Sequence, residues 1–136
     1  CKGCKELQNA HKSFRLRRLP SVLMIHLKRF EYTHGVRRPK LDSFMQYPVD
    51  TPLEIREEDT GELVRYELVA LVKHYGSLTG GHYIACCKVQ DKWFEFDDDL
   101  VKAINDPKEI LCREAYVLFY QKIQHDMEPM QKKQKQ

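Results

Sequence analysis

Three strand-like runs follow one another in the second half of the chain, with only short turn-like segments between them. They cover residues 65–73, 81–89 and 92–96, and β-branched and aromatic side chains recur in each of them. Short runs at this spacing are typical of strands that pair with their neighbours in the chain. The pattern therefore predicts an antiparallel sheet as the main structure.

The segments around these runs add further strands. The dense apolar run "PSVLMIHLKRF" at 20–30 predicts a buried strand. Strict alternation would place Val22, Met24 and His26 on one face and Leu23, Ile25 and Leu27 on the other. Two prolines in 43–55 favour short, extended edge segments. The polar stretch around Thr60–Gly61 predicts a turn, and "HGVRRPKLD" a loop with a basic patch.

One helical segment is expected near the end of the chain. In "DPKEILCREA" either Asp106 or Asn105 can act as the N-cap, and Pro107 suits the first helical position. The apolar run "AYVLFYQKI" then predicts a final strand. We therefore expect an α+β fold with a dominant antiparallel β-sheet and one short helix near the end.

Composition limits the classes of function. The chain has 136 residues, 42% of them hydrophobic and 10% aromatic, which suits one domain or part of one. A net charge of +3 does not favour nucleic acid as a partner, and no apolar run approaches the roughly 20 residues of a membrane span. Five cysteines, two of them adjacent, fit a reducing compartment, the cytoplasm or the nucleus. Residues 124–136 end in a Lys-rich run that predicts a solvated tail.

A histidine and a group of carboxylates stand out in "GGHYIACCKVQDKWFEFDDD". A hairpin that turns near Gln90–Asp91 has two plausible registers, in which His82 faces position 98 or 99. Strict alternation favours Asp98 as the neighbour of His82. A carboxylate beside an imidazole fixes its tautomer and stabilises its charged form. An ordinary structural histidine followed by an acidic turn is the alternative.

A histidine that acts as a general base needs a nucleophile within reach. Cys86 shares the strand face of His82, but four residues along a strand is about 13 Å. Cys87 points to the other face, and Cys112 lies in or near the late helical segment. Ser77 and Thr79 occupy the same short loop without a nucleophile-elbow motif. We expect the chain to hold a base and its orienting carboxylate and to lack the attacking group.

Several motifs in order resemble one family. "GGHYIACCKVQDKWFEFDDDLV" resembles the histidine box of the ubiquitin-specific proteases, which are papain-like cysteine deubiquitinases. "LRRLPSVLMIHLKRFEY", "RYELVALVKHYGSLTGGHY" and "EAYVLFYQK" resemble three further segments of the same catalytic domain, in the same order. The resemblance covers nearly everything from Leu16 to Lys122.

The resemblance implies roles for particular residues. His82 would be the general base and Asp97 the third member of the triad, with Asp98 in support; a bend or bulge would be needed to bring Asp97 beside His82. Gly80 and Gly81 would admit the Gly-Gly tail of ubiquitin. The remaining substrate-binding positions would be Tyr83, beside the channel, and His74 and Tyr75, in the loop that covers the tail. For His74 a structural role is the alternative.

The resemblance also implies an organisation in which this chain is the C-terminal part of the catalytic domain. Residues 1–15 would belong to the fingers and 16–123 to the palm, and the missing N-terminal half would supply the nucleophilic cysteine. Cys1 and Cys4 would be two of the four ligands of a zinc ion. The expected partners are ubiquitin and ubiquitinated proteins. A ubiquitin-binding pseudoprotease without activity is the alternative function.

Overall fold

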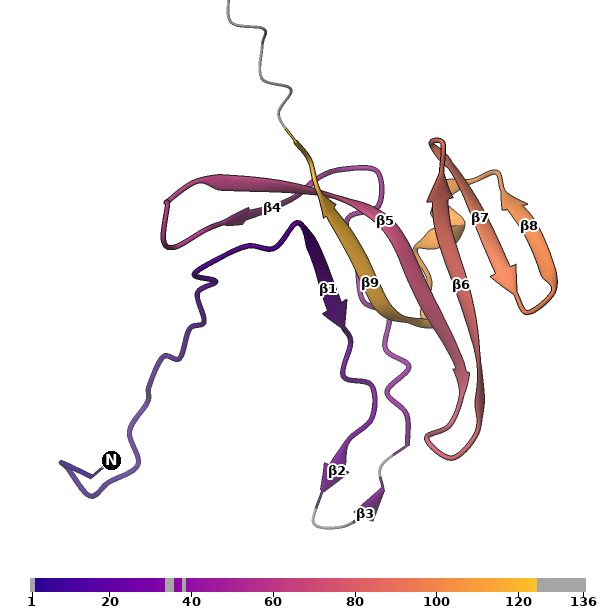
Figure 1. The fold of residues 1–136 in the computed structure, drawn as a ribbon. Coiled ribbons are helices and arrows are strands. Elements are labelled where there is room, and N and C mark those ends of the chain that lie inside the picture. Colours follow the sequence, from indigo (N-terminus) through magenta and orange to yellow (C-terminus); the bar gives the residue numbers. More distant parts are fainter. Residues whose placement is uncertain (1, 34–35, 38, 125–136) are drawn as a thin grey trace, which may run out of the picture.

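The computed structural model describes residues 2–33, 36–37 and 39–124. Seven of the strands in this part form one sheet, in which the order is β1-β9-β5-β6-β7-β8 and β4 pairs with β5 outside that path (Figure 1). All pairings are antiparallel. The strands are β1 (Val22–His26), β4 (Leu53–Arg56), β5 (Leu63–Gly76), β6 (Gly81–Val89), β7 (Lys92–Asp97), β8 (Leu100–Ile104) and β9 (Ala115–Lys122). A separate small hairpin pairs β2 (Tyr32–Thr33) with β3 (Val36–Arg37).

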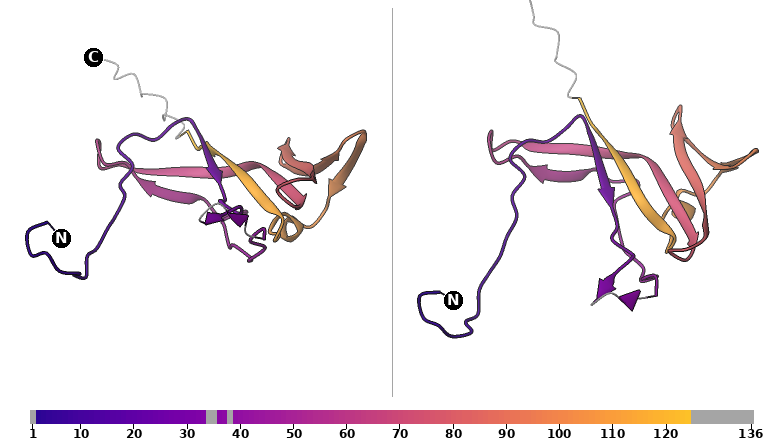
Figure 2. Two further views of the ribbon diagram at one scale, coloured as in Figure 1. Left: turned by 90° about the horizontal axis from the view of Figure 1, so that it is seen from below. Right: turned by 60° about the horizontal axis from the view of Figure 1, so that its bottom comes forward.

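The 14-residue strand β5 organises the sheet. Its first part pairs with β4, its last part with β6, and β9 lies along its other edge. Two shifts in the β5–β9 register, at Leu68/Ala70 and Val72/Lys73, interrupt the regular pairing. Such irregularities bend a strand and increase its twist. In Figure 2, β5 accordingly crosses the molecule, with β4 at one end and the β6–β7–β8 strands at the other.

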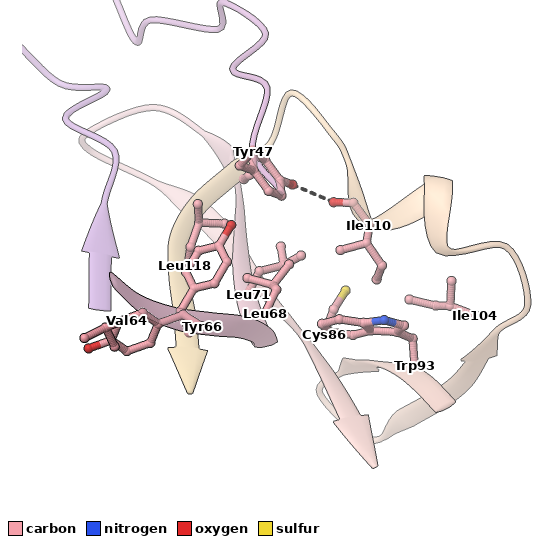
Figure 3. Packing of buried hydrophobic residues seen from close by; sticks show 12 residues of the cluster. Tyr47, Val64, Tyr66, Leu68, Leu71, Cys86, Trp93, Ile104, Ile110 and Leu118 are labelled. Atoms are coloured by element: carbon pink, nitrogen blue, oxygen red, sulfur yellow. Dashed lines mark hydrogen bonds between the residues drawn. The ribbon is translucent and has the colours of Figure 1, made fainter. Parts of the chain in front are cut away.

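The core lies on one face of this sheet. In Figure 3, Leu71, Cys86 and Trp93 from neighbouring strands gather under Ile110, which is fully buried. Tyr47 closes this side because its hydroxyl donates to the carbonyl of Ile110 at 2.6 Å. On the other face, the rings of Phe30, His74, Tyr83 and Tyr116 form a cluster in which His74 is buried. The apolar side chains that β1, β7 and β8 present on that face stay half-buried or exposed.

The helical segment is a single 3₁₀ turn, η1 (Pro107–Ile110). Asp106, rather than Asn105, is its N-cap: its carboxylate accepts from the backbone N–H of Lys108 at 2.9 Å. The expected α+β chain dominated by antiparallel sheet is therefore confirmed, with less helix than the sequence suggested. Among the described residues no helix is long and apolar enough to cross a membrane.

Two expectations about strands were wrong or incomplete. The segment 20–30 forms only the five-residue β1, an edge strand and not a buried one. The alternation was right, because Val22 and Met24 are 52% and 62% exposed while Leu23 and Ile25 pack on the core. β8 was not predicted, because the run "LVKAI" is short and directly follows the acidic residues 97–99.

Candidate active site

The β6–β7 hairpin sets the geometry around His82. Gln90 and Asp91 turn it with φ values of 48° and 63°, as a two-residue turn between twisted strands requires. The pairs from Ala85↔Phe96 to Val89↔Lys92 follow the second of the two expected registers. In this register Asp97 lies on the sheet face of His82, one diagonal step along. The prediction that Asp98 is level with His82 was wrong, and the β6–β7 pairing shows no bulge.

His82 and Asp97 are in direct contact. The imidazole Nε2 lies 2.5 Å from Oδ1 of Asp97, and both side chains are partly exposed. The hydrogen bond between His82 and the carboxylate of Asp97 raises the pKa of His82, desolvation of the imidazole opposes this, and the charges of Asp97 and Asp98 add to the rise. Within the described part of the chain, Nδ1 of His82 has no hydrogen-bond partner. One nitrogen is thus oriented by a carboxylate while the other can accept a proton.

Asp98 reaches the site from the turn that follows β7. Its backbone is left-handed, with φ at 49°, and ligand atoms of His82, Asp97 and Asp98 all lie within 4.8 Å of one another. Two carboxylates therefore face one imidazole. Three such groups can also bind a cation, but Oδ1 of Asp97 is already hydrogen-bonded to His82. No other group of at least three potential ligands is found among the described residues.

The two glycines before His82 have different surroundings. A Cβ on Gly81 would collide with the Tyr75 carbonyl oxygen and the His74 ring, whereas one on Gly80 would meet nothing within 4 Å. Position 81 therefore needs glycine because of the chain's own packing. A side chain at position 80 would extend into open space.

His74 and Tyr75 lie in β5 and not in a loop, so that expectation was wrong, and Tyr83 lies in β6. Tyr75 is paired with His82 and lies on its face of the sheet. His74 and Tyr83 pair with each other on the opposite face, where their ring centroids are 4.6 Å apart. His74 is only 2% exposed, and burial, followed by the charge of Lys40, lowers its pKa. Its structure agrees with a packing role, while Tyr75 and Tyr83 remain exposed.

The described part of the chain brings no thiol into contact with His82. Cys86 shares its face but is fully buried, and burial raises its pKa to about 11. Burial likewise raises the pKa of Cys87. Both effects disfavour the thiolate that attacks.

The zinc prediction stays a prediction. Cys4 is exposed and has a free thiol, and Cys1 lies outside the described residues. A single described thiol cannot complete a tetrahedral site.

Sequence reasoning missed one pair of residues beside the site. Lys73 interrupts the apolar run of β5 and is 6% exposed, and its ammonium forms a 2.7 Å ion pair with Glu95 of β7. The signal was available, because a lysine at a core-facing position of a strand needs a partner.

Comparison with known proteins identifies the family. Residues 1–120 match the family described as "Ubiquitin carboxyl-terminal hydrolase". "Putative ubiquitin carboxyl-terminal hydrolase 11" of Arabidopsis thaliana is 43% identical over 133 residues, which are 94% of this chain and 15% of that protein. The human "Ubiquitin carboxyl-terminal hydrolase 15" is 42% identical over 127 residues, 90% of this chain and 13% of that protein. The chain belongs to the ubiquitin carboxyl-terminal hydrolase family, and the resemblance to the ubiquitin-specific proteases is confirmed.

Solved structures agree. The chain matches one in the SAGA DUB module containing Ubp8, bound to monoubiquitin, with a TM-score of 0.73 and 39% identity over 91% of this chain and 28% of that one. A second structure of the module, bound to ubiquitin aldehyde, gives a TM-score of 0.67 at 40% identity over 78% of this chain and 25% of the other. The chain thus spans less than a third of the length of each of these relatives.

Proposed function

We propose that this chain supplies the general base and its orienting carboxylate to a thiol-dependent ubiquitin hydrolase. The observation that carries the proposal is the contact of His82 Nε2 with Asp97 at 2.5 Å, which leaves Nδ1 open on an exposed surface. The nucleophilic cysteine would come from another segment of a longer protein. Membership of the family supports the reaction class.

The residues of the site would act in a fixed sequence. A cysteine thiol gives its proton to Nδ1 of His82 while its sulfur attacks the carbonyl carbon after the last glycine of ubiquitin. Asp97 stabilises the imidazolium that forms. The imidazolium returns the proton to the departing lysine amine, and a thioester remains. Water, deprotonated by His82, then hydrolyses the thioester and releases ubiquitin. The oxyanion donors would lie near the cysteine, outside this chain.

The substrate would approach over the turn of residues 77–80, which joins β5 to β6. Gly80 has open space around it, and Tyr75 and Tyr83 are 40% and 56% exposed on either side of the β5–β6 pair. We assign to these three residues the contact with the Gly-Gly end of ubiquitin. The solved relatives bound to monoubiquitin and ubiquitin aldehyde support ubiquitin as the ligand. We assign no step of the reaction to zinc.

The test uses ubiquitin that carries a thiol-reactive electrophile at its C-terminus. We expect the full-length protein containing this chain to form a covalent adduct, measured by mass spectrometry. In the His82→Ala variant, turnover should fall by at least about a hundredfold, because general-base catalysis contributes at least that much. Ubiquitin affinity in that variant should change little.

Three results would contradict the proposal. Near-normal turnover in His82→Ala would exclude His82 as the base. Ubiquitin binding by the wild-type protein without any adduct would indicate a binding module that has lost its activity. An adduct formed by this chain alone would show that one of its own cysteines is the nucleophile.

A further inference from the structure

An ion pair crosses the sheet beside the candidate site. Lys73 is in β5 and Glu95 in β7, with β6 between these strands. Their ammonium and carboxylate groups meet at 2.7 Å, and the two side chains are 8% and 25% exposed. Both residues point to the sheet face that carries His82 and Asp97, as the strand registers show. At such low exposure, the interaction between charges is stronger than on an open surface.

Lys73 stands at the level of Asp97 as well. Lys73 is paired with Ile84 across β5 and β6. Continuing the β6–β7 register by one residue beyond Ala85↔Phe96 sets Asp97 opposite the same Ile84. Lys73 and Asp97 are therefore two strand spacings apart, about 10 Å between Cα atoms. Lys73 already spans the same two spacings to reach Glu95, so the backbone of Asp97 lies within comparable range of Lys73, with Ile84 between the two.

Whether the Lys73 ammonium binds Glu95 or Asp97 affects His82. Oδ1 of Asp97 is hydrogen-bonded to the imidazole of His82, and an ammonium bound to the same carboxylate would compete for that oxygen. A positive charge at this place would also disfavour the imidazolium form of His82. The ammonium is held elsewhere: it donates to Glu95, beside the buried thiol of Cys86, which lies 4.0 Å from the same carboxylate oxygen. Burial has the largest single effect and lowers the pKa of Lys73, but the hydrogen bond to Glu95 and the negative charge of nearby groups together outweigh it, so the pKa is raised and Lys73 stays charged.

We propose that Glu95 is a positioning residue that holds the Lys73 ammonium away from Asp97. The carboxylate of Asp97 then forms its hydrogen bond with His82 without a competing cation. Glu95 does not touch the reacting atoms and acts only through Lys73. The proposal rests on the proposed function for its kinetic readout, but not for its measurement on His82 itself.

The first experiment is Glu95→Gln in the full-length protein that contains this chain. The buried ammonium loses its anionic partner, and we expect it to turn to Asp97. The pKa of His82, followed by NMR, should fall by about 0.5 pH unit or more, because a cation then competes for its carboxylate. With a ubiquitin substrate, kcat should fall about tenfold or more while KM stays within about twofold, as for an interaction made only in the transition state.

A matched control is Glu67→Gln. It removes one of the two carboxylate partners of Lys88, the other being Asp91, and so breaks a cross-strand ion pair of 3.2 Å in the same sheet but further from the site. Neither the pKa of His82 nor kcat should change. If Glu67→Gln lowers both as much as Glu95→Gln does, the effect is not specific to Lys73 and the proposal is wrong.

A second pair of variants separates positioning from stability. Lys73→Met combined with Glu95→Met removes both charges, and such apolar replacement of a buried ion pair is often neutral for stability. Since no ammonium remains to compete, the pKa of His82 should equal that of the wild-type protein, and kcat should return to within about twofold of the wild-type value. Lys73→Met alone should likewise leave the pKa of His82 undiminished, which provides a test should Glu95→Gln fail to fold.

The opposite results overturn the proposal. A folded Glu95→Gln protein with a lower melting temperature but an unchanged His82 pKa would show that the ion pair is only structural. A fall in the pKa of His82 in Lys73→Met would exclude the competing ammonium as the cause. If the wild-type protein does not cleave ubiquitin, the proposed function fails, and the NMR titration still decides the role of Glu95.

Discussion

The His82–Asp97 contact links the chemistry of one residue to pH. Asp97 at 2.5 Å is the main reason why the pKa of His82 is raised above its ordinary value. A raised folded-state pKa means that protonated His82 stabilises the fold in acid, below its unfolded pKa. This contribution is lost as the pH rises through the folded-state value. Because both side chains are partly exposed, we expect the contribution to be small.

Asp97→Asn tests this residue-scale expectation. Without the carboxylate, the pKa of His82 should fall back toward its unperturbed value. The difference in melting temperature between wild type and variant should be largest near pH 5 to 6, where histidine is protonated and aspartate ionised, and should disappear as the pH rises above the raised pKa. NMR titration and thermal unfolding at several pH values measure the two effects.

Asp99→Asn is the matched control at the same scale. Asp99 is in the same acidic run, but it is not among the groups that shift the pKa of His82. It should leave the titration of His82 unchanged. An unaltered His82 pKa in Asp97→Asn would contradict the assigned cause.

At the scale of elements, the β5–β6 hairpin shows why two adjacent glycines are not equivalent. Gly76↔Gly81 is the last pair of the hairpin ladder, and the turn follows at once. The His74 ring and the Tyr75 carbonyl oxygen fill the space beside Gly81, while Gly80 is open. The close packing of β5 against β6 therefore depends on the absence of a side chain at one of the two positions.

We expect Gly81→Ala to destabilise the hairpin and Gly80→Ala to have little effect. The added methyl group at position 81 meets a backbone oxygen, which cannot move without shifting β5, so the cost should be about 1–3 kcal/mol. Urea denaturation of both variants measures the difference. Equal stability of the two variants would show that the hairpin relaxes around the methyl group.

At the scale of the whole molecule, the described residues cover the two faces of the sheet unequally. Tyr47 and Ile110 close the face that holds Leu71 and Trp93. The opposite face presents an open row of apolar side chains that share no cover in the described part of the chain: Val22, Met24, Val117, Phe119, Phe94, Phe96 and Val101. Apolar patches that continue over several strands favour association.

The chain by itself should therefore associate as its concentration rises. Sedimentation velocity over a range of concentrations measures this. Met24→Lys combined with Val101→Lys should weaken the association, because both side chains are more than 60% exposed on that face and charged groups resist burial. Leu7→Lys is the control, since Leu7 is exposed in the extended segment before the sheet. A chain that stays monomeric at every concentration would contradict this prediction.

Much of the fold could be predicted because it is local. The runs that became β5, β6, β7 and β9 were found from their residue types, and the Gln90–Asp91 turn from its position between two of them. The edge position of β1 could not be found in the same way. Whether an apolar strand is buried depends on what covers it, and the cover comes from residues far along the chain.

The candidate site shows the same division. Sequence proximity was enough to place a carboxylate near His82, because both are in one hairpin. Which aspartate makes the contact depended on a register choice of one residue, since such a shift moves every side chain of a strand to the other face. The Lys73–Glu95 pair lies across an intervening strand, where no local pattern relates the two residues.

The sequence by itself determined the family, the antiparallel character of the sheet and the set of residues around His82. These depend on residue types and short spacings, which the backbone converts into structure locally. For the partner of His82 the family resemblance pointed to Asp97 and strand alternation to Asp98, and the tertiary structure has Asp97 in contact. Only the tertiary structure decided that His74 packs behind Gly81 and that Lys73 is paired with Glu95. Each of these contacts joins side chains from different strands, and their meeting depends on strand order, register and twist, which are properties of the assembled sheet.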